Sequence, residues 1–298
     1  MRVSVVVISK NERALDGTLT ALADAGTAAA AALPVDPVVE LVVVDASQGR
    51  LDDIRRSHPD VRWVDFAPVP GKRITIPEQR NRGVRVASGD VVVFTDAGCR
   101  PHEGWLEELV APIVRGEESV TCGVTGSLGG PSVYDAHTVT EDYVAECATI
   151  NLAFTRAAFD AVAGFDEAFD YCSDSDFTWR LNDAGYRIRR VAGARLDHEW
   201  GGARRQAKRA WYYGAGRARL YLKHRNRQRW ATMARQDPIL VAYPVFLLGL
   251  PLTLRLRPYP LLLLLPLWRN RRHQPLRTLL DHLCYGAGAL SHVAKARA

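Results

Sequence analysis

Three aspartates in the first two thirds of the sequence stand where a carboxylate can do chemistry. Asp45 and Asp96 each follow an apolar run, VVV and VVVFT, and Asp174 lies in the acidic sequence SDSD. A carboxylate accepts hydrogen bonds from vicinal hydroxyls, holds a divalent cation, or takes a proton from an attacking alcohol. Each aspartate also has a purely structural alternative, because aspartate caps turns and opens helices.

The segments around the first two aspartates predict a parallel α/β sheet. Continuous runs rich in β-branched residues are typical of strands buried on both faces, and the longer segments between them predict helices. The strands are Val3–Ile8, Val38–Val44 and Asp90–Thr95, and the helices are Leu15–Leu33 and Pro77–Ala87. Since open α/β sheets bind ligands at the carboxyl ends of their strands, Asp45 and Asp96 are predicted to lie at a binding edge.

The third aspartate belongs to a second series of elements. A helix is predicted to begin near Trp105, and the Gly-rich residues 122–131 are predicted to form a loop with short strands. Residues 148–154 predict a strand, 155–165 a helix and turn, and 173–188 a helix leading into a strand. Asp174 suits the N-terminus of that last helix, and Gly185 suits its C-cap.

The composition excludes wholesale disorder. The chain has 298 residues, 47% of them hydrophobic and 24% charged, which is ordinary for a folded protein. Its five cysteines lack the close pairing of zinc or redox sites and are predicted to be free thiols. The apolar run near the N-terminus is about one strand long, with no small-residue cleavage site, so no secretory signal is expected and cytoplasmic residence is predicted.

The last third has a different character. From Trp200 to Gln236 there are many Lys and Arg and no acid, so nucleic acid, anionic lipid and phosphorylated substrates are all possible partners. The apolar pieces Ile239–Leu254 and Tyr259–Trp268 are each shorter than the ~20 residues that span a bilayer. They predict a re-entrant or interfacial hairpin, and a buried helical hairpin or a dimer surface is the alternative. Its flanking arginines are Arg227, Arg229, Arg235, Arg269, Arg271 and Arg272.

An ordered series of motifs between Val3 and His198 resembles family 2 glycosyltransferases with the GT-A fold. The motifs are VVVISKNE, VVVDAS, EQRNRG, FTDAGC, NLAFTRAAFDAVAGFDEAF, SDSDFTWRL and LDHEWGG. The resemblance implies a Rossmann-like, mostly parallel sheet flanked by helices over residues 1–200. Residues 201–298 are then a basic and apolar helical appendage that associates with a membrane.

The resemblance also implies roles on the donor side. Asp45, supported by Glu12, would contact the nucleotide, and Arg80 and Asn81 would face it. Asp96 stands where the family has an Asp-x-Asp motif that holds a divalent cation, but Ala97 and Gly98 replace the further acids. A cation, Mg²⁺ or Mn²⁺, is still expected on Asp96, with His198 as a second metal ligand.

On the acceptor side, the resemblance makes Asp174 the catalytic base. Asp176 and Arg180 would orient this base or bind phosphate, and Asn151 would contact the substrate. Two departures from the family pattern occur here, Ala163 in place of the first glycine of a Gly-Gly-Phe-Asp turn and Ser173 in place of a glutamate.

These roles imply an inverting hexosyl transfer from a nucleoside-diphosphate donor to a lipid-linked or glycan hydroxyl. The enzyme is expected to work at the cytoplasmic membrane face, with no nucleic-acid partner. One alternative is a sugar-phosphate nucleotidyltransferase, although the sequence after the first strand, SKNERALDG, lacks that class's Gly-rich basic loop. Another is a non-enzymatic nucleic-acid-binding protein using residues 200–236. The oligomeric state stays open.

Overall fold

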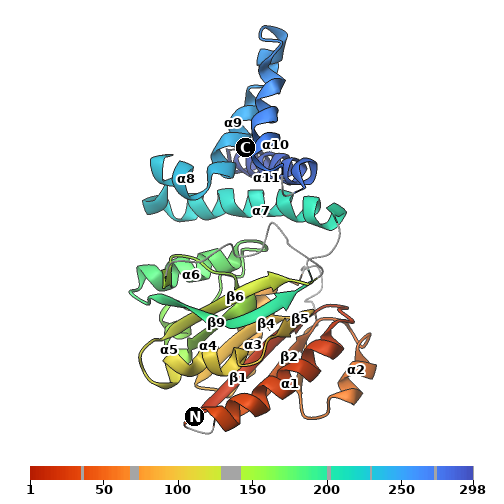
Figure 1. Cartoon of the computed structure of the whole chain (residues 1–298), viewed down its shortest axis with the longest axis vertical. Coiled ribbons are helices and arrows are strands. Elements are labelled where there is room, and N and C mark those ends of the chain that lie inside the picture. The colour runs from red at the N-terminus through yellow and green to blue at the C-terminus, as the bar shows by residue number, and fades with distance from the viewer. Residues whose placement is uncertain are drawn as a thin grey trace. The chain divides into compact units, whose positions relative to one another are not determined.

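The computed structural model describes residues 1–34, 37–67, 74–128, 142–199, 203–228, 230–271 and 274–297. The chain divides into two compact units, Met1–Glu199 and Trp200–Ala298. Figure 1 labels most of the helices and strands of both. Those of the first unit are β1 (Arg2–Ser9), α1 (Leu15–Ala32), β2 (Val38–Asp45), α2 (Asp52–Ser57), β3 (Arg62–Asp65), α3 (Ile76–Val86), β4 (Val91–Asp96), β5 (Cys99–Pro101), α4 (Trp105–Val114), β6 (Val120–Ser127), β7 (Tyr143–Val144), the 3₁₀ turn η1 (Thr149–Asn151), β8 (Leu152–Thr155), α5 (Arg156–Ala161), α6 (Ser173–Asp183) and β9 (Ile188–His198).

The strands of the first unit form one mixed sheet in the order β3-β2-β1-β4-β8-β6-β9-β5, with β7 beside β9. The first four strands in this order are parallel. β8 is antiparallel to both β4 and β6, and β6 is parallel to β9. It follows that β1, β2, β4, β6 and β9 all end at the same edge of the sheet.

Helices cover both faces of this sheet. The β1-α1-β2 and β3-α3-β4 crossovers run in opposite directions along it, so right-handed connections place α1 and α3 on opposite faces. On the α3 face, a core cluster joins that helix to α5 and α6. Its aromatic rings pack closely, with Phe177 4.2 Å from Phe165 and 5.5 Å from Phe154 between ring centroids.

Three details differ from the sequence predictions. The Gly-rich segment is one strand, β6, as far as Ser127, and residues 129–131 lie outside the described residues. Gly123 is needed there because a Cβ at this position would lie 2.1 Å from the carbonyl oxygen of Ala194 on β9. Residues 149–151, inside the predicted strand 148–154, form a 3₁₀ turn, so strand β8 begins only at Leu152. The short elements α2, β3, β5 and β7 were not predicted.

The second unit is helical among its described residues. Its elements are α7 (Ala203–Lys223), η2 (Arg225–Arg227), α8 (Trp230–Gln236), α9 (Pro238–Leu248), η3 (Leu250–Leu254), η4 (Tyr259–Leu263), α10 (Leu264–Arg269) and α11 (Pro275–Arg297). Helix α7 lies in the basic part of the predicted helical appendage, and the unpredicted helix α11 packs along α7 and α9. Of the helices described, none combines the length and the apolar character that crossing a membrane requires.

Candidate functional site

The carboxyl ends of β1, β2 and β4 bring two of the predicted acids to one edge of the sheet. Asp45 pairs with Ser9 and Asp96 pairs with Ile8, so the two aspartates lie on either side of β1 at nearly the same level. With neighbouring strands about 4.8 Å apart, their backbones are separated by roughly 10 Å. Two acids on either side of one strand end could contact the same extended ligand.

Asp45 is buried in a junction between the loops that follow β1 and β2. Its Oδ1 accepts a hydrogen bond from the Ser47 amide at 2.9 Å, and the Ser47 hydroxyl accepts one from the Asn11 amide at 2.7 Å. Asn11 adopts the left-handed backbone conformation, with φ +63°, and is followed by the half-buried Glu12. The predicted nucleotide-binding residues Asp45 and Glu12 therefore come from adjoining loops.

Arg80 connects the edge at Asp96 to the first turn of α6. Helix α3 begins with a capping box, in which Thr75 and Glu78 exchange hydrogen bonds, and Arg80 follows in its second turn. The guanidinium is buried, with Nη2 3.8 Å from Asp96 Oδ1 and Nη1 3.5 Å from the Ser173 hydroxyl. Its carbon also lies 5.7 Å from the centroid of the Phe165 ring. Arg80 thus places a fixed positive charge between two predicted acids.

Asp174, the predicted base, is half-buried in the first turn of α6. Its Oδ1 accepts a hydrogen bond from the Ser175 amide at 2.9 Å. Burial raises the pKa of this carboxyl, the charge of Arg80 opposes that rise, and the neighbouring Glu146 adds to it. The structure therefore brings Asp96, Arg80 and Asp174 into one cluster.

Glu146, in the loop after β7, belongs to this cluster and was missed by the sequence reasoning. Its two carboxylate oxygens accept hydrogen bonds from the Ser175 hydroxyl at 2.6 Å and from the Trp179 indole at 3.0 Å. Both donors are on α6, beside Asp174. No periodic pattern or motif marks residue 146, so only the fold reveals the contact.

A Glu146→Gln substitution is expected to move the pH profile of catalysis. Removing the negative charge makes ionisation of Asp174 easier, so its pKa falls and the acid limb of kcat shifts to lower pH. The measurement is kcat against pH for the wild type and for Glu103→Gln, an exposed glutamate outside the cluster. An acid limb that stays in place, or moves upward, contradicts the assignment.

Asp176 and Arg180 pair with each other within α6. Asp176 is fully buried, and its Oδ2 lies 2.9 Å from Arg180 Nε, one helical turn on. Arg180 also donates a hydrogen bond to the carbonyl oxygen of Val162, after α5. The hydrogen bond from Arg180 to Val162 links α6 to the turn after α5. These contacts hold α6, which carries Asp174, and so support the predicted role of orienting the base. Phosphate binding by Arg180 stays a prediction.

Asn81 also forms hydrogen bonds to the backbone, at Phe165. Its amide nitrogen donates to the Phe165 carbonyl and to Glu167 Oε1, both at 2.9 Å, and its oxygen accepts from the Phe165 amide at 2.9 Å. The turn that it fixes contains Ala163 and Gly164, both with positive φ, +57° and +70°. The predicted nucleotide contact is thus replaced by a structural role, and Ala163 adopts a conformation that favours glycine.

Asn151 is buried and likewise not available to a substrate. Its oxygen accepts from the Trp105 indole at 2.9 Å, and its amide nitrogen donates to the carbonyls of Val124 and Ala194 at 3.1 and 3.0 Å. It therefore joins α4, β6 and β9 at the centre of the sheet. The predicted substrate contact is corrected, because a fully engaged amide inside the sheet cannot reach a ligand.

Asn151→Ala is expected to lower the free energy of unfolding by about 2–4 kcal/mol, because it leaves a buried indole N–H and two carbonyls without this partner. Chemical denaturation monitored by fluorescence measures the loss. Asn182→Ala, which removes an amide bonded to two carbonyls nearer the surface, should cost less than about 1 kcal/mol. Equal losses in the two variants would contradict the structural role.

His198 ends β9 at the same edge as Asp96. It pairs with Cys99, and its Nε2 lies 3.9 Å from the position that a Cβ on Gly98 would occupy, so it borders the turn after Asp96. A carboxylate and an imidazole suit Mn²⁺, but the described residues contain no group of three acid, His or Cys side chains able to hold a metal alone. Among the described residues, Asp96 and His198 would therefore need further ligands from outside the protein to hold a cation.

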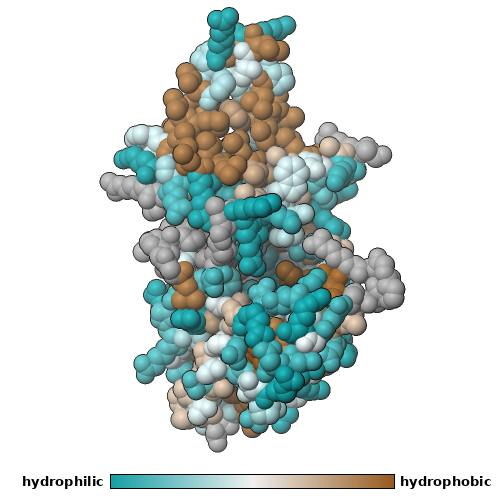
Figure 2. All heavy atoms as spheres, turned by 90° about the vertical axis from the view of Figure 1, so that its right-hand side faces the viewer, coloured by the Kyte–Doolittle hydropathy of each residue, from teal (hydrophilic) through white to brown (hydrophobic). Residues whose placement is uncertain are grey.

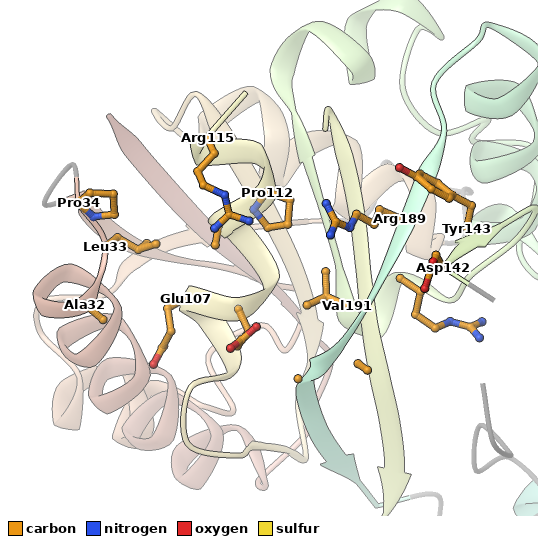
Figure 3. Close-up of a pocket in the computed structure, with 15 residues that line it drawn as sticks. Ala32, Leu33, Pro34, Glu107, Pro112, Arg115, Asp142, Tyr143, Arg189 and Val191 are labelled. Carbon is orange, nitrogen blue, oxygen red and sulfur yellow. The ribbon is translucent and has the colours of Figure 1, made fainter. Parts of the chain in front are cut away.

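A hollow of about 720 Å³ lies away from these acids, among the first half of β9, the end of α1 and helix α4 (Figure 3). Arg115 and Arg189 approach it from different elements, and both are paired with Glu117. Because β9 runs parallel to β1, its first half lies toward the edge opposite the acids. The hollow is therefore distinct from the candidate site.

Comparisons with known proteins agree with this arrangement. Residues 4–165 match the sequence profile described as glycosyl transferase family 2. The pre-mycofactocin glycosyltransferase of Mycobacterium tuberculosis is 28% identical over 213 residues, which cover 62% of this chain and 43% of that protein. Glycosyltransferase AglE of Haloferax volcanii is 31% identical over 121 residues, covering 37% of this chain and 39% of that protein. The chain thus spans less than half the length of these curated relatives.

Solved structures show the same fold. The mannosyltransferase PcManGT from Pyrobaculum calidifontis, in complex with GDP-Man and Mn²⁺, superposes with a TM-score of 0.69 and 18% identity over 99% of this chain and 87% of that one. GalNAc-T7 with UDP, GalNAc and Mn²⁺ superposes with a TM-score of 0.54 and 15% identity, covering 80% of this chain and 56% of that one. The predicted GT-A-like α/β fold is confirmed, with a mixed sheet. Because the profile matches more than half of the chain, including the strand ends at Asp45 and Asp96, the chain belongs to glycosyl transferase family 2.

Proposed function

We propose that this glycosyltransferase moves a hexose from a nucleoside diphosphate to a hydroxyl of a lipid-linked or glycan acceptor, with inversion. The supporting observation is the cluster of Asp96, Arg80 and Asp174, in which one buried cation stands between two carboxylates of different elements. A donor crossing the end of β1 from Asp45 would bring its diphosphate to Asp96 and Arg80. The sugar would then lie toward Asp174.

Asp174 is suited to accept the proton of the acceptor hydroxyl. As that oxygen bonds to the anomeric carbon, the bond from this carbon to the diphosphate oxygen breaks and the proton passes to the carboxylate. Partial burial makes Asp174 a stronger base, and the charge of Arg80 keeps it ionised. An inverting transfer needs one carboxylate that takes the acceptor proton, and Asp174 is the candidate for it.

The leaving diphosphate needs its charge compensated. Arg80 supplies a fixed positive charge. Asp96 and His198 are the residues that would hold a divalent cation, Mg²⁺ or Mn²⁺, which when bound neutralises further charge on the diphosphate. The Mn²⁺ in both related structures supports this part of the proposal.

Family membership favours sugar transfer over the sugar-phosphate nucleotidyltransferase alternative. The cytoplasmic membrane face as the place of reaction stays a prediction, favoured by a lipid-linked acceptor. A hydroxyl of a glycan that is not linked to a lipid also fits the proposed reaction.

A thermal-shift screen tests donor binding directly. UDP, GDP and dTDP are each added to the full chain with and without Mn²⁺, since a ligand that binds only the folded state raises Tm. We expect one nucleotide to raise Tm, more strongly with Mn²⁺, and the rise to disappear in Asp96→Asn. Unchanged Tm with all three nucleotides would contradict the proposal.

A further inference from the structure

The second unit differs from the first in charge. Residues 200–298 contain 19 Lys and Arg but only two acids, whereas residues 1–199 contain 20 Lys and Arg against 31 acids. The two acids of the second unit, Asp237 and Asp281, neutralise little of the positive charge on the surface of that unit. Asp237 accepts hydrogen bonds from Arg217 and Tyr221, and Asp281 is buried. Its surface is therefore strongly cationic.

The same unit exposes a large apolar surface, which we call the apolar band and which is brown in Figure 2. The band lies on the hairpin formed by α9, η3, η4 and α10, and each of its side chains is at least 40% exposed. Its members are Val245, Leu248, Leu250, Leu252, Leu254, Leu256, Leu261, Leu262, Leu264, Leu265 and Trp268. An apolar surface of this extent marks an interaction site.

The hairpin is held together without these leucines. The rings of Phe246 and Tyr259 stack across its two arms at 5.3 Å, and the Tyr259 hydroxyl donates to the Phe246 carbonyl at 3.0 Å. Prolines interrupt both arms and give short 3₁₀ segments in place of one long helix. The band is therefore presented outward by a hairpin with its own internal contacts.

Exposed arginines lie at both ends of the apolar band. Arg255 and Arg257 are in the turn between η3 and η4, Arg269 is the last residue of α10, and Arg271 follows it. The Arg271 guanidinium lies 4.7 Å from the ring of Trp268. Apolar side chains bordered by cationic and aromatic ones match the acyl and headgroup layers of an anionic membrane.

We propose that the apolar band docks into the surface of an anionic phospholipid bilayer, with these arginines in the headgroup layer. A second copy is disfavoured as the occupant because two strongly cationic faces would repel one another. Nucleic acid would use the cations but leave the leucines in water. The inference rests on the second unit alone and does not depend on sugar transfer.

Vesicle co-sedimentation of the full chain tests this docking. Neutral vesicles of phosphatidylcholine are compared with anionic vesicles in which about 30% of the lipid is phosphatidylglycerol. We expect binding to the anionic vesicles. The double variant Leu264→Gln/Leu265→Gln should weaken it about tenfold or more. Arg255→Gln/Arg257→Gln should weaken it about fivefold for each arginine removed.

Matched controls are two exposed apolar residues off the hairpin, Val38→Gln/Leu222→Gln, and two exposed arginines of α3, Arg82→Gln/Arg85→Gln. Both should bind as the wild type does, and all variants should keep its Tm. Binding that is equal on neutral vesicles, or unchanged by the leucine variant, overturns the proposal. So does a leucine variant that only converts a dimer to a monomer, or binding of RNA without binding of vesicles.

Discussion

Asp174→Asn is expected to lower kcat by about 10²–10⁴-fold while donor binding stays close to that of the wild type. The carboxylate is the group placed to take the acceptor proton, and general-base catalysis contributes on this scale. The amide keeps the size of the side chain and can still accept the Ser175 hydrogen bond, so α6 should stay in place. Initial rates with saturating donor and acceptor, together with donor titration, measure the two effects separately.

The matched control is Asp183→Asn, the same substitution at the exposed last residue of α6. It should leave kcat within about twofold, because it is more than two turns away from the cluster. Near-normal turnover by Asp174→Asn would refute its role as the base. A parallel loss in both variants would instead indicate that α6 as a whole is sensitive to charge.

Arg80→Met is expected to reduce both stability and turnover. Removing the cation takes its charge away from Asp96 and Asp174, and because the Arg80–Asp96 pair is 3.8 Å apart with Asp96 35% exposed, the cost is expected to be about 1–3 kcal/mol. The pKa of Asp174 should rise further, so that the acid limb of kcat moves to higher pH. Denaturation curves and a pH profile at a temperature where the variant is folded test the two parts.

Arg82→Met provides the comparison, since Arg82 lies two residues along the same helix and is exposed. Its unfolding free energy should change by less than about 0.5 kcal/mol. If Arg80→Met were as stable and as active as Arg82→Met, the buried guanidinium would have neither of the roles assigned to it.

The positions of Asp45 and Asp96 could be predicted because each follows a buried β-branched run, and a parallel sheet brings such strand ends together. The side-chain contacts could not. Asn81 and Asn151 bond to backbone far away in the chain, at residues 165 and 194, and nothing in the neighbouring sequence indicates those partners. Both asparagines lie in motifs of the family, and for this reason they were predicted to contact the nucleotide or the substrate.

Two further misses have the same kind of cause. Glu146 lies in a loop without periodicity, so its contact with α6 depends wholly on the fold. Asp176 was expected to orient the base or bind phosphate, and the local sequence does not reveal that its side chain is fully buried against Arg180, one helical turn on. In the second unit, a hairpin could be predicted from two apolar pieces that are each too short to span a bilayer, but not which of its leucines are exposed.

The most direct test of the central claim, that Asp45, Asp96 and Asp174 serve one donor site, is a structure of this chain with a bound nucleotide sugar and Mn²⁺. We predict the base and ribose beside Asp45, the diphosphate at Asp96 and Arg80, and the anomeric carbon facing Asp174. A donor found instead in the hollow between Glu107 and Arg189, or one that leaves Asp174 without any contact to the sugar, would contradict the account.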